Sequence, residues 1–166
     1  MSNCLTQACA AALLAFSLMA SSAVPTAAEG IKPVVSASGV IATRSAYGME
    51  ETVERLKKDI AAKGITFFQQ IDQASLAAKS GIELRPSILL IFGNPPLGTQ
   101  FITSNPNAGL DWPVRLLLTQ DDNGDVWAVW TDFGWIARRH NIRDRAAQFE
   151  MATKVVGSIT STIATR

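Results

Sequence analysis

An excess of charge of either sign is absent from this sequence. Its 166 residues hold 15 Lys and Arg against 14 Asp and Glu, a formal net charge of +1 at pH 7. Such a chain has no global field to attract nucleic acid or an anionic membrane, so we expect neither as a partner of the mature protein. Charged residues make up only 17% and hydrophobic residues 48%, which excludes a disordered chain and indicates one folded domain.

Charged side chains are missing altogether from residues 1–28, and residues 8–20 are almost continuously apolar. The apolar run is too short to span a bilayer as a helix, and small residues follow it. This pattern is typical of a secretory signal peptide and predicts export to a bacterial periplasm. Cleavage fits after Ala23 or Ala28; we favour Ala28, which leaves a lead-in at 29–38 and a single domain at 39–166. A retained membrane anchor is the alternative, since no basic residue precedes the run.

Cysteine is absent beyond the predicted signal peptide, which contains both Cys4 and Cys9. The mature chain therefore has no disulfide, and it has no Cys-x-x-Cys-His motif for covalent haem. His140 is the only histidine, so a zinc site would need carboxylates as its other ligands. We predict no cofactor and keep a metal- or haem-associated periplasmic protein as an alternative.

Hydrophobic patterns predict five strands and two long helices. The strands are expected at 39–46, 65–72, 87–92, 114–119 and 125–132, and the helices at 49–63 and 143–163. A short helical turn capped by Ser75 is expected at 75–81, and Asn123-Gly124 predicts a tight hairpin turn. The order β-α-β4-α indicates an α+β single domain, with a mostly antiparallel sheet and both long helices on one face.

The segment Gly93-Asn94-Pro95-Pro96-Leu97-Gly98-Thr99 has the composition of a ligand-binding loop and follows a buried strand. A phosphate loop is excluded, because Pro95 and Pro96 lack the backbone N–H donors that phosphate needs. The simpler interpretation is a rigid turn, in which Asn94 bonds local backbone and Gly93 adopts a conformation that other residues resist.

All four tryptophans lie between residues 112 and 135, and two of them occupy opposite faces of one expected strand. Trp130 shares a face with Val126 and Ala128, whereas Trp127 lies on the other face. The ring turned away from the helices needs a cover. A second copy of the chain is our first interpretation, a groove for a small apolar ligand the second, and a layer formed by residues 99–113 the third.

Catalytic patterns are weak. Asp72, Asp111, Asp132 and Asp144 could supply a carboxylate pair, but the sequence gives no distance between them, and no Gly-x-Ser-x-Gly elbow is present. An enzyme would need a pocket that joins His140 to Asp72, Asp132 or Asn94. The arginines near His140 could bind an anion, although a solvated helix start is the simpler interpretation.

Four motifs together resemble the signature of the bacterial domain-of-unknown-function 302 family, over roughly residues 39–163. They are Phe92-Gly93-Asn94-Pro95, Gly98-Thr99, Leu110-Asp111-Trp112-Pro113 and Arg139-His140. The resemblance implies a TATA-binding-protein-like fold class and homodimers, and it implies no established reaction. The sequence departs from many relatives at Gln73, where they carry histidine after the aspartate matched by Asp72.

We therefore predict an exported small-ligand-binding or interaction module that acts as a homodimer. A hydrolase or other enzyme that uses His140 with a nearby carboxylate is the alternative. No catalytic or metal-ligating residue is assigned. The candidate ligand-binding residues are Asp72, Gly93, Asn94, Pro95, Trp112, Trp127, Trp130, Asp132, Arg139 and His140.

Overall fold

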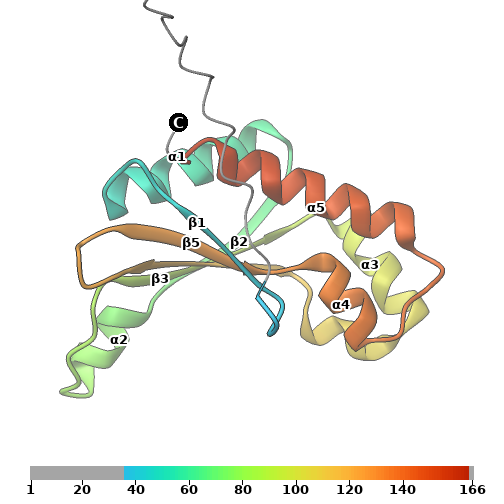
Figure 1. Ribbon diagram of the computed structural model, residues 1–166, viewed down its shortest axis with the longest axis horizontal. Helices are drawn as coiled ribbons and strands as arrows, with labels where there is room; N and C mark the ends of the chain where they lie inside the picture. The colour runs from blue at the N-terminus through green and yellow to red at the C-terminus, as the bar shows by residue number, and fades with distance from the viewer. Residues whose placement is uncertain (1–35, 165–166) are drawn as a thin grey trace, which may run out of the picture.

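The computed structural model describes residues 36–164, which form a five-stranded antiparallel sheet with helices (Figure 1). The strands are β1 (Val40–Arg44), β2 (Thr66–Asp72), β3 (Ser87–Gly93), β4 (Val114–Gln120) and β5 (Val126–Thr131), in the order β1-β5-β4-β3-β2. Every neighbouring pair is antiparallel. The predicted α+β class and its antiparallel sheet are confirmed, whereas the predicted signal peptide lies outside the described residues.

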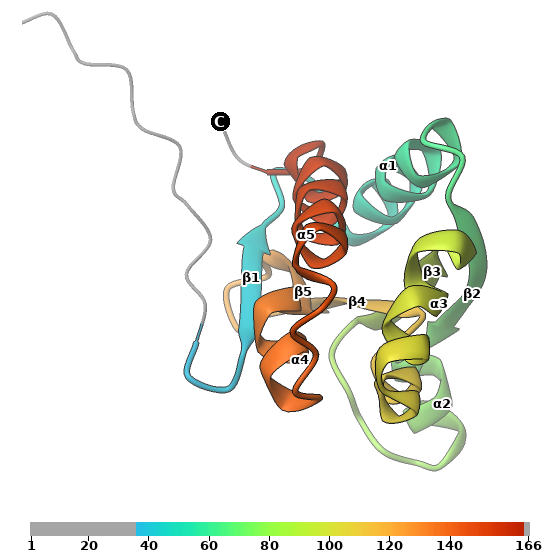
Figure 2. The same ribbon diagram turned by 90° about the vertical axis from the view of Figure 1, so that its right-hand side faces the viewer.

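Five α-helices accompany the sheet within residues 36–164. They are α1 (Met49–Ala62), α2 (Gln73–Lys79), α3 (Pro95–Ser104), α4 (Phe133–Arg139) and α5 (Ala146–Ser161), with a 3₁₀ helix, η1 (Pro106–Leu110), after α3. The two long helices, α1 and α5, lie over one face of the sheet, while α2 projects on the opposite side (Figure 1). In Figure 2, α5 has α1 and α3 beside it.

The core lies between the long helices and one face of the sheet, as the spacing of apolar residues predicts. Leu56 and Ile60 of α1 and Ile159 of α5 are fully buried, and so are Leu90 of β3 and Leu116 of β4. Alternate residues of β5 contribute to the same core, and Trp130 is only 7% exposed. The predicted separation of Trp130 and Trp127 onto opposite faces agrees with this arrangement, in which Trp130 is the ring under the helices.

The opposite face of the sheet, here called the open face, carries one apolar row across all five strands. Directly paired residues of antiparallel strands share a face, and the row follows from the register. Its members are Ala42, Val129, Leu117, Leu89 and Ile71, each half-buried. Trp127 lies on this face.

Two helices were not predicted from the sequence, α3 and α4. The α3 segment contains Gly98 and two prolines, and it gains its stability from tertiary contact: the rings of Phe101 and Phe149 stack with centroids 4.2 Å apart. Because α3 packs against α5, the residues after Thr99 do not cover the open face, and the third interpretation of Trp127 is wrong. His140 follows α4 as its C-cap instead of lying in a plain connection.

Three local predictions also need correction. The N-cap of α2 is Asp72, whose carboxylate accepts a hydrogen bond from the backbone N–H of Ser75 at 2.8 Å. In the β4–β5 hairpin only Gly124 has a positive φ, so the connection is longer than a two-residue tight turn. Helix α5 begins at Ala146 instead of near residue 143, after Asn141 takes a positive φ of 50°.

Candidate ligand-binding pocket

A pocket of about 400 Å³ lies on the helix-covered side, between α5, α3 and the β3 end of the sheet. This volume falls within the range of small-molecule sites, roughly 300–1,000 Å³. Most of its walls are apolar side chains and glycine backbone. The lining residues are Lys63, Ile65, Phe92, Gly93, Asn94, Leu97, Gly98, Phe101, Trp112, Val114, Phe133, Met151, Ala152, Lys154, Val155, Val156 and Ser158.

Trp112 forms one wall of the pocket, and two glycines make room for its indole ring. A Cβ atom at Gly98 would lie 1.6 Å from the indole Nε1, and one at Gly93 would lie 3.2 Å from it. Any side chain at residue 98 would therefore collide with the ring. Phe68 meets the indole edge-to-face, with ring centroids 6.2 Å apart. The motif glycines and Trp112, which are separate in the sequence, form one packing unit.

The start of α3 shows why the loop before it is not an anion site. The side chain of Asn94 accepts a hydrogen bond from the backbone N–H of Leu97 at 3.1 Å and caps the helix. Pro95 and Pro96 occupy the first helical positions and donate nothing. Gly93 does not have a positive φ, so the prediction of an unusual backbone conformation there is wrong. Its lack of a side chain serves the contact with Trp112.

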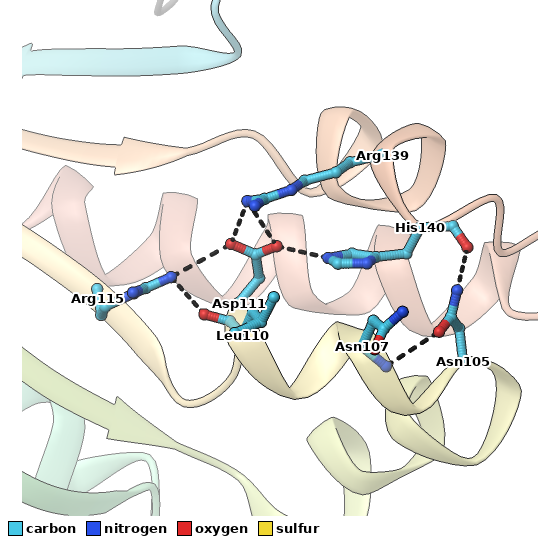
Figure 3. Close-up of polar contacts among 7 residues, drawn as sticks. All are labelled: Asn105, Asn107, Leu110, Asp111, Arg115, Arg139 and His140. Carbon is cyan, nitrogen blue, oxygen red and sulfur yellow. Dashed lines mark hydrogen bonds and ion pairs between the residues drawn. The ribbon is translucent and has the colours of Figure 1, made fainter.

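Asp111 is the centre of a polar network beside the pocket (Figure 3). Its carboxylate, only 5% exposed, accepts from Arg139 Nη1 at 3.1 Å through both oxygens and from Arg115 Nη2 at 3.2 Å. The ring Nε2 of His140, itself 5% exposed, lies 2.6 Å from Asp111 Oδ2. Three side chains therefore converge on one buried carboxylate.

Further bonds extend this network to the connection after α3. Asn105 Nδ2 donates to the backbone carbonyl of His140 at 2.8 Å, and Arg115 also donates to the carbonyl of Leu110 at 2.6 Å (Figure 3). The network thus ties η1 and the start of β4 to the C-terminal end of α4. Because Trp112 directly follows Asp111, the same bonds hold the indole in the pocket wall.

The bonding of Asp111 also limits what chemistry this network can perform. An ionised carboxylate is an acceptor only, and both oxygens of Asp111 already accept two hydrogen bonds each. Proton abstraction from a substrate would require dismantling these contacts. The geometry therefore favours a positioning role for His140 and Arg139.

Among the carboxyl groups of residues 36–164, two have lowered pKa values, and one of them is paired with a residue that lines the pocket. The side-chain hydrogen bond from Lys154, which lines the pocket, lowers the pKa of Glu150 below its ordinary value. On the hairpin, the Trp127 indole N–H donates to Asp121 at 2.9 Å and lowers the pKa of that carboxyl. The backbone N–H groups of Asn123 and Asp125 act in the same direction.

The candidate residues do not form one site. Gly93, Asn94 and Trp112 meet at the pocket, and Pro95 begins the helix beside it. The remaining candidates lie elsewhere in the fold. Arg139 and His140 bind Asp111, Asp72 and Asp132 cap α2 and α4, Trp130 is in the core, and Trp127 is on the open face.

The pocket that an enzyme would need, joining His140 to Asp72, Asp132 or Asn94, is not found among the described residues. The carboxylate partner of His140 is Asp111, and neither pocket that Asp111 or Asn94 lines includes His140. Asp72 and Asp132 serve as helix caps. Within residues 36–164, no group of three or more His, Cys, Asp or Glu side chains is arranged to hold a metal ion.

Sequence reasoning missed the helical walls of the pocket. Met151 and Val155 of α5 lie one residue before the buried pair Ala152 and Val156, so the apolar face of α5 is wider than its core stripe. Met151 is 55% exposed. An apolar face wider than a sheet contact requires is the signal that could have indicated a pocket.

The fold and the motif residues define a domain of the family described as "Domain of unknown function DUF302". The family model matches residues 41–159, and the chain belongs to this family. A crystal structure of an uncharacterised conserved DUF302 protein from Bacillus stearothermophilus superposes with a TM-score of 0.70 at 18% identity. The alignment covers 76% of this chain and 99% of that one, and it shows a shared fold.

Among individual proteins, the chain is similar to segments of two proteins named as fluoride-specific ion channels. It is 35% identical over 105 residues to FluC 1 of Brucella suis biovar 1 (strain 1330) and to FluC 2 of Brucella melitensis biotype 1 (strain ATCC 23456). The match covers 63% of this chain but only 41% and 39% of those proteins. The chain thus spans about two fifths of their length.

None of the helices in residues 36–164 combines the length and apolar character of a membrane-spanning segment.

Proposed function

We propose that this protein is a binding module for a small, mostly apolar molecule held in the pocket between α3 and α5. The observation that carries the proposal is that residues from separate sequence motifs line the same pocket. Gly93, Gly98, Asn94 and Trp112 all line the pocket, and the Asp111 network fixes Trp112 from behind. A glycine inside a helix costs about 1 kcal/mol relative to alanine, so Gly98 weakens α3 in return for the indole wall.

The chemistry of the walls supports the same conclusion. Small-molecule sites combine an apolar lining with a few polar groups that fix orientation. Here Phe92, Phe101 and Phe133, each 5% exposed or less, form the deeper walls, while Met151 is exposed. The Asp111 network, by contrast, has its acceptors occupied, so a binding role is better supported than hydrolysis with His140.

Filling the pocket tests the proposal. We expect the uncharged fluorescent probe N-phenyl-1-naphthylamine to bind the wild-type protein and to bind Val155→Trp at least tenfold more weakly, because the larger side chain occupies the pocket. Thr153→Trp is the matched control, since Thr153 lies on the same helix, is exposed and does not line the pocket. Absence of probe binding, or equal affinity of wild type and Val155→Trp, would contradict a ligand pocket here.

A second candidate role is assembly, and the open face supports it. We propose that the exported domain forms a homodimer through the apolar row of Ala42, Val129, Leu117, Leu89 and Ile71. Helix α2 lies on the same side of the sheet (Figure 1). Its Leu76 is 52% exposed, and Ile82 and Leu84 in the segment after it are 60% and 48% exposed. A twofold axis would pair this surface with itself.

Native mass spectrometry of the protein recovered from a periplasmic fraction tests export and assembly together. A dimer whose chains begin at residue 29 is the expected result. A monomer across the micromolar range would overturn the dimer, and an intact N-terminus in a membrane fraction would overturn cleavage. Extra mass released on denaturation would identify a retained ligand.

A further inference from the structure

The charged residues that line the pocket have one sign. Lys63, the C-cap residue of α1, and Lys154 of α5 are the charged residues that line it, and no Asp or Glu of the described chain does so. The two lysines come from different helices that flank the same opening. Their ammonium groups therefore place positive charge in the pocket lining, while the carboxylates that pair with them do not line the pocket.

Each ammonium group has a carboxylate partner that an anionic ligand would share or replace. Lys63 pairs with Asp59 at 2.5 Å and Lys154 with Glu150 at 2.6 Å, each four residues earlier in the chain. The Lys154 side chain is 73% exposed and that of Lys63 is 30% exposed. The Lys154–Glu150 pair is solvent-exposed and therefore weak, so an anion at the opening can compete for the Lys154 ammonium group.

The pocket lining changes from apolar side chains at its buried end to charged side chains at its opening. Phe92 and Val156 are each 1% exposed and Phe101 is 4% exposed, so the inner wall is continuous with the hydrophobic core. The lysines lie where the lining reaches solvent. A ligand that matches this arrangement has an apolar body and one charged end.

We propose that the ligand is an amphipathic monoanion, with its apolar body against Trp112 and the inner phenylalanines and its carboxylate between Lys63 and Lys154. This inference rests on the proposed function, since it names the chemistry of the molecule that the same pocket binds. The volume of about 400 Å³ is near the lower end for ligand pockets, which favours a short amphiphile over a full-sized membrane lipid.

Competition with three ten-carbon amphiphiles tests the charge requirement. Decanoate, 1-decanol and decyltrimethylammonium are each titrated against bound N-phenyl-1-naphthylamine at low ionic strength, the two ions below their micelle concentrations and decanol below its solubility limit. We expect decanoate to compete at least tenfold better than the ammonium compound. We also expect added salt to weaken decanoate but not decanol.

Lysine variants separate the head-group contact from the pocket itself. Lys63→Ala/Lys154→Ala should lose the preference for decanoate while keeping decanol binding, and Lys63→Arg/Lys154→Arg should retain the preference. Lys58→Ala is the matched control, because Lys58 is an exposed lysine of α1 that does not line the pocket. Both replaced side chains are at the surface, so we expect the thermal unfolding of the variants to match wild type.

The outcomes distinguish this inference from the proposed function. If decanoate and decanol compete equally and the double alanine variant changes neither, the anion preference is wrong and the apolar pocket stands. If the ammonium compound competes best, the sign of the charge is wrong. If neither the probe nor any amphiphile binds, the proposed function fails as well.

Discussion

The two faces of the sheet use the same strands in different ways. Trp130 and Trp127 are three residues apart on β5, yet Trp130 lies in the core beneath the helices and Trp127 lies half-buried on the open face. The helix-covered face is completed by this chain, apart from the pocket at one end. The open face carries a continuous apolar row, and among the described helices α2 lies on its side of the sheet (Figure 1). The difference shows that one face is buried within the chain, whereas the apolar row of the other face is only half-buried, and this is the surface on which the proposed dimer depends.

The largest expected effect comes from the buried tryptophan. Trp130→Ala removes a core ring that is 7% exposed, and we expect the free energy of unfolding to fall by about 3–5 kcal/mol in urea denaturation. Trp127→Ala should cost less, about 1–2 kcal/mol in dilute protein, because that ring is only half-buried and loses one hydrogen bond to Asp121.

Measuring both stability costs at several protein concentrations makes the comparison of Trp130→Ala with Trp127→Ala more discriminating. If the open face is a dimer interface, the cost of Trp127→Ala grows with concentration, because assembly stabilises only the wild type. Equal costs for Trp130→Ala and Trp127→Ala at every concentration would contradict the distinction between the two faces.

The next effect concerns the pocket wall. Gly98→Ala places a Cβ atom against the indole of Trp112, and overpacking of this kind costs about 1–3 kcal/mol. We expect lower thermal stability and weaker probe binding. In Gly98→Ala/Trp112→Ala the clash is gone, so the double variant should be more stable than the two single effects predict when added. Strict additivity in this double-mutant cycle would show that the two residues do not form one packing unit.

A charge in the middle of the open face tests assembly without disturbing the core. Leu117→Lys places an ammonium group in the apolar row, and we expect the protein to become monomeric in light scattering while its circular dichroism is unchanged. Ala147→Lys, an exposed change on α5, is the control that should leave the dimer intact. If Leu117→Lys stays dimeric, the dimer interface is not on the open face.

The parts of the fold that could be predicted are those whose residues repeat with a clear period. Val53, Leu56 and Ile60 define α1 through their spacing, and the alternation in 126–131 places Trp130 and Trp127 on opposite faces of the strand. The termination of α1 was equally local, because Gly64 adopts a positive φ of 64°. Such signals need no knowledge of distant residues.

The unpredicted parts depend on contacts between segments distant in the chain. Helix α3 exists because Phe101 stacks on Phe149, and Gly98 is explained only by Trp112. Asp111 could be named as a carboxylate, but its partnership with His140, 29 residues away, has no local signal. The α5 residues that line the pocket have the same spacing as ordinary core residues, so the sequence does not distinguish them. Sequence patterns therefore identified the motifs but not the pocket that their residues form.

The smallest expected effect is a pH dependence at the hairpin, where Trp127 reports directly. The pKa of Asp121 is lowered from its ordinary value of 3.8, chiefly by the hydrogen bond from the Trp127 indole. A carboxyl whose pKa is lower in the folded state adds stability above its unfolded pKa and loses it as the pH falls through the folded value. We therefore expect wild type to be slightly more stable than Asp121→Asn at neutral pH, with the difference beginning to fall near pH 3.8 and disappearing below the lower pKa of the folded state.

The Trp127 indole N–H resonance checks this expectation in the same samples. It should shift as acid protonates Asp121 in the wild type and stay constant in Asp121→Asn over the same range. Taking the difference between the two proteins removes the contribution of the other carboxyl groups, which titrate in both. A stability difference that is constant from neutral pH to below 3.8 would show that the hydrogen bond, and not the charge of Asp121, anchors Trp127 on the open face.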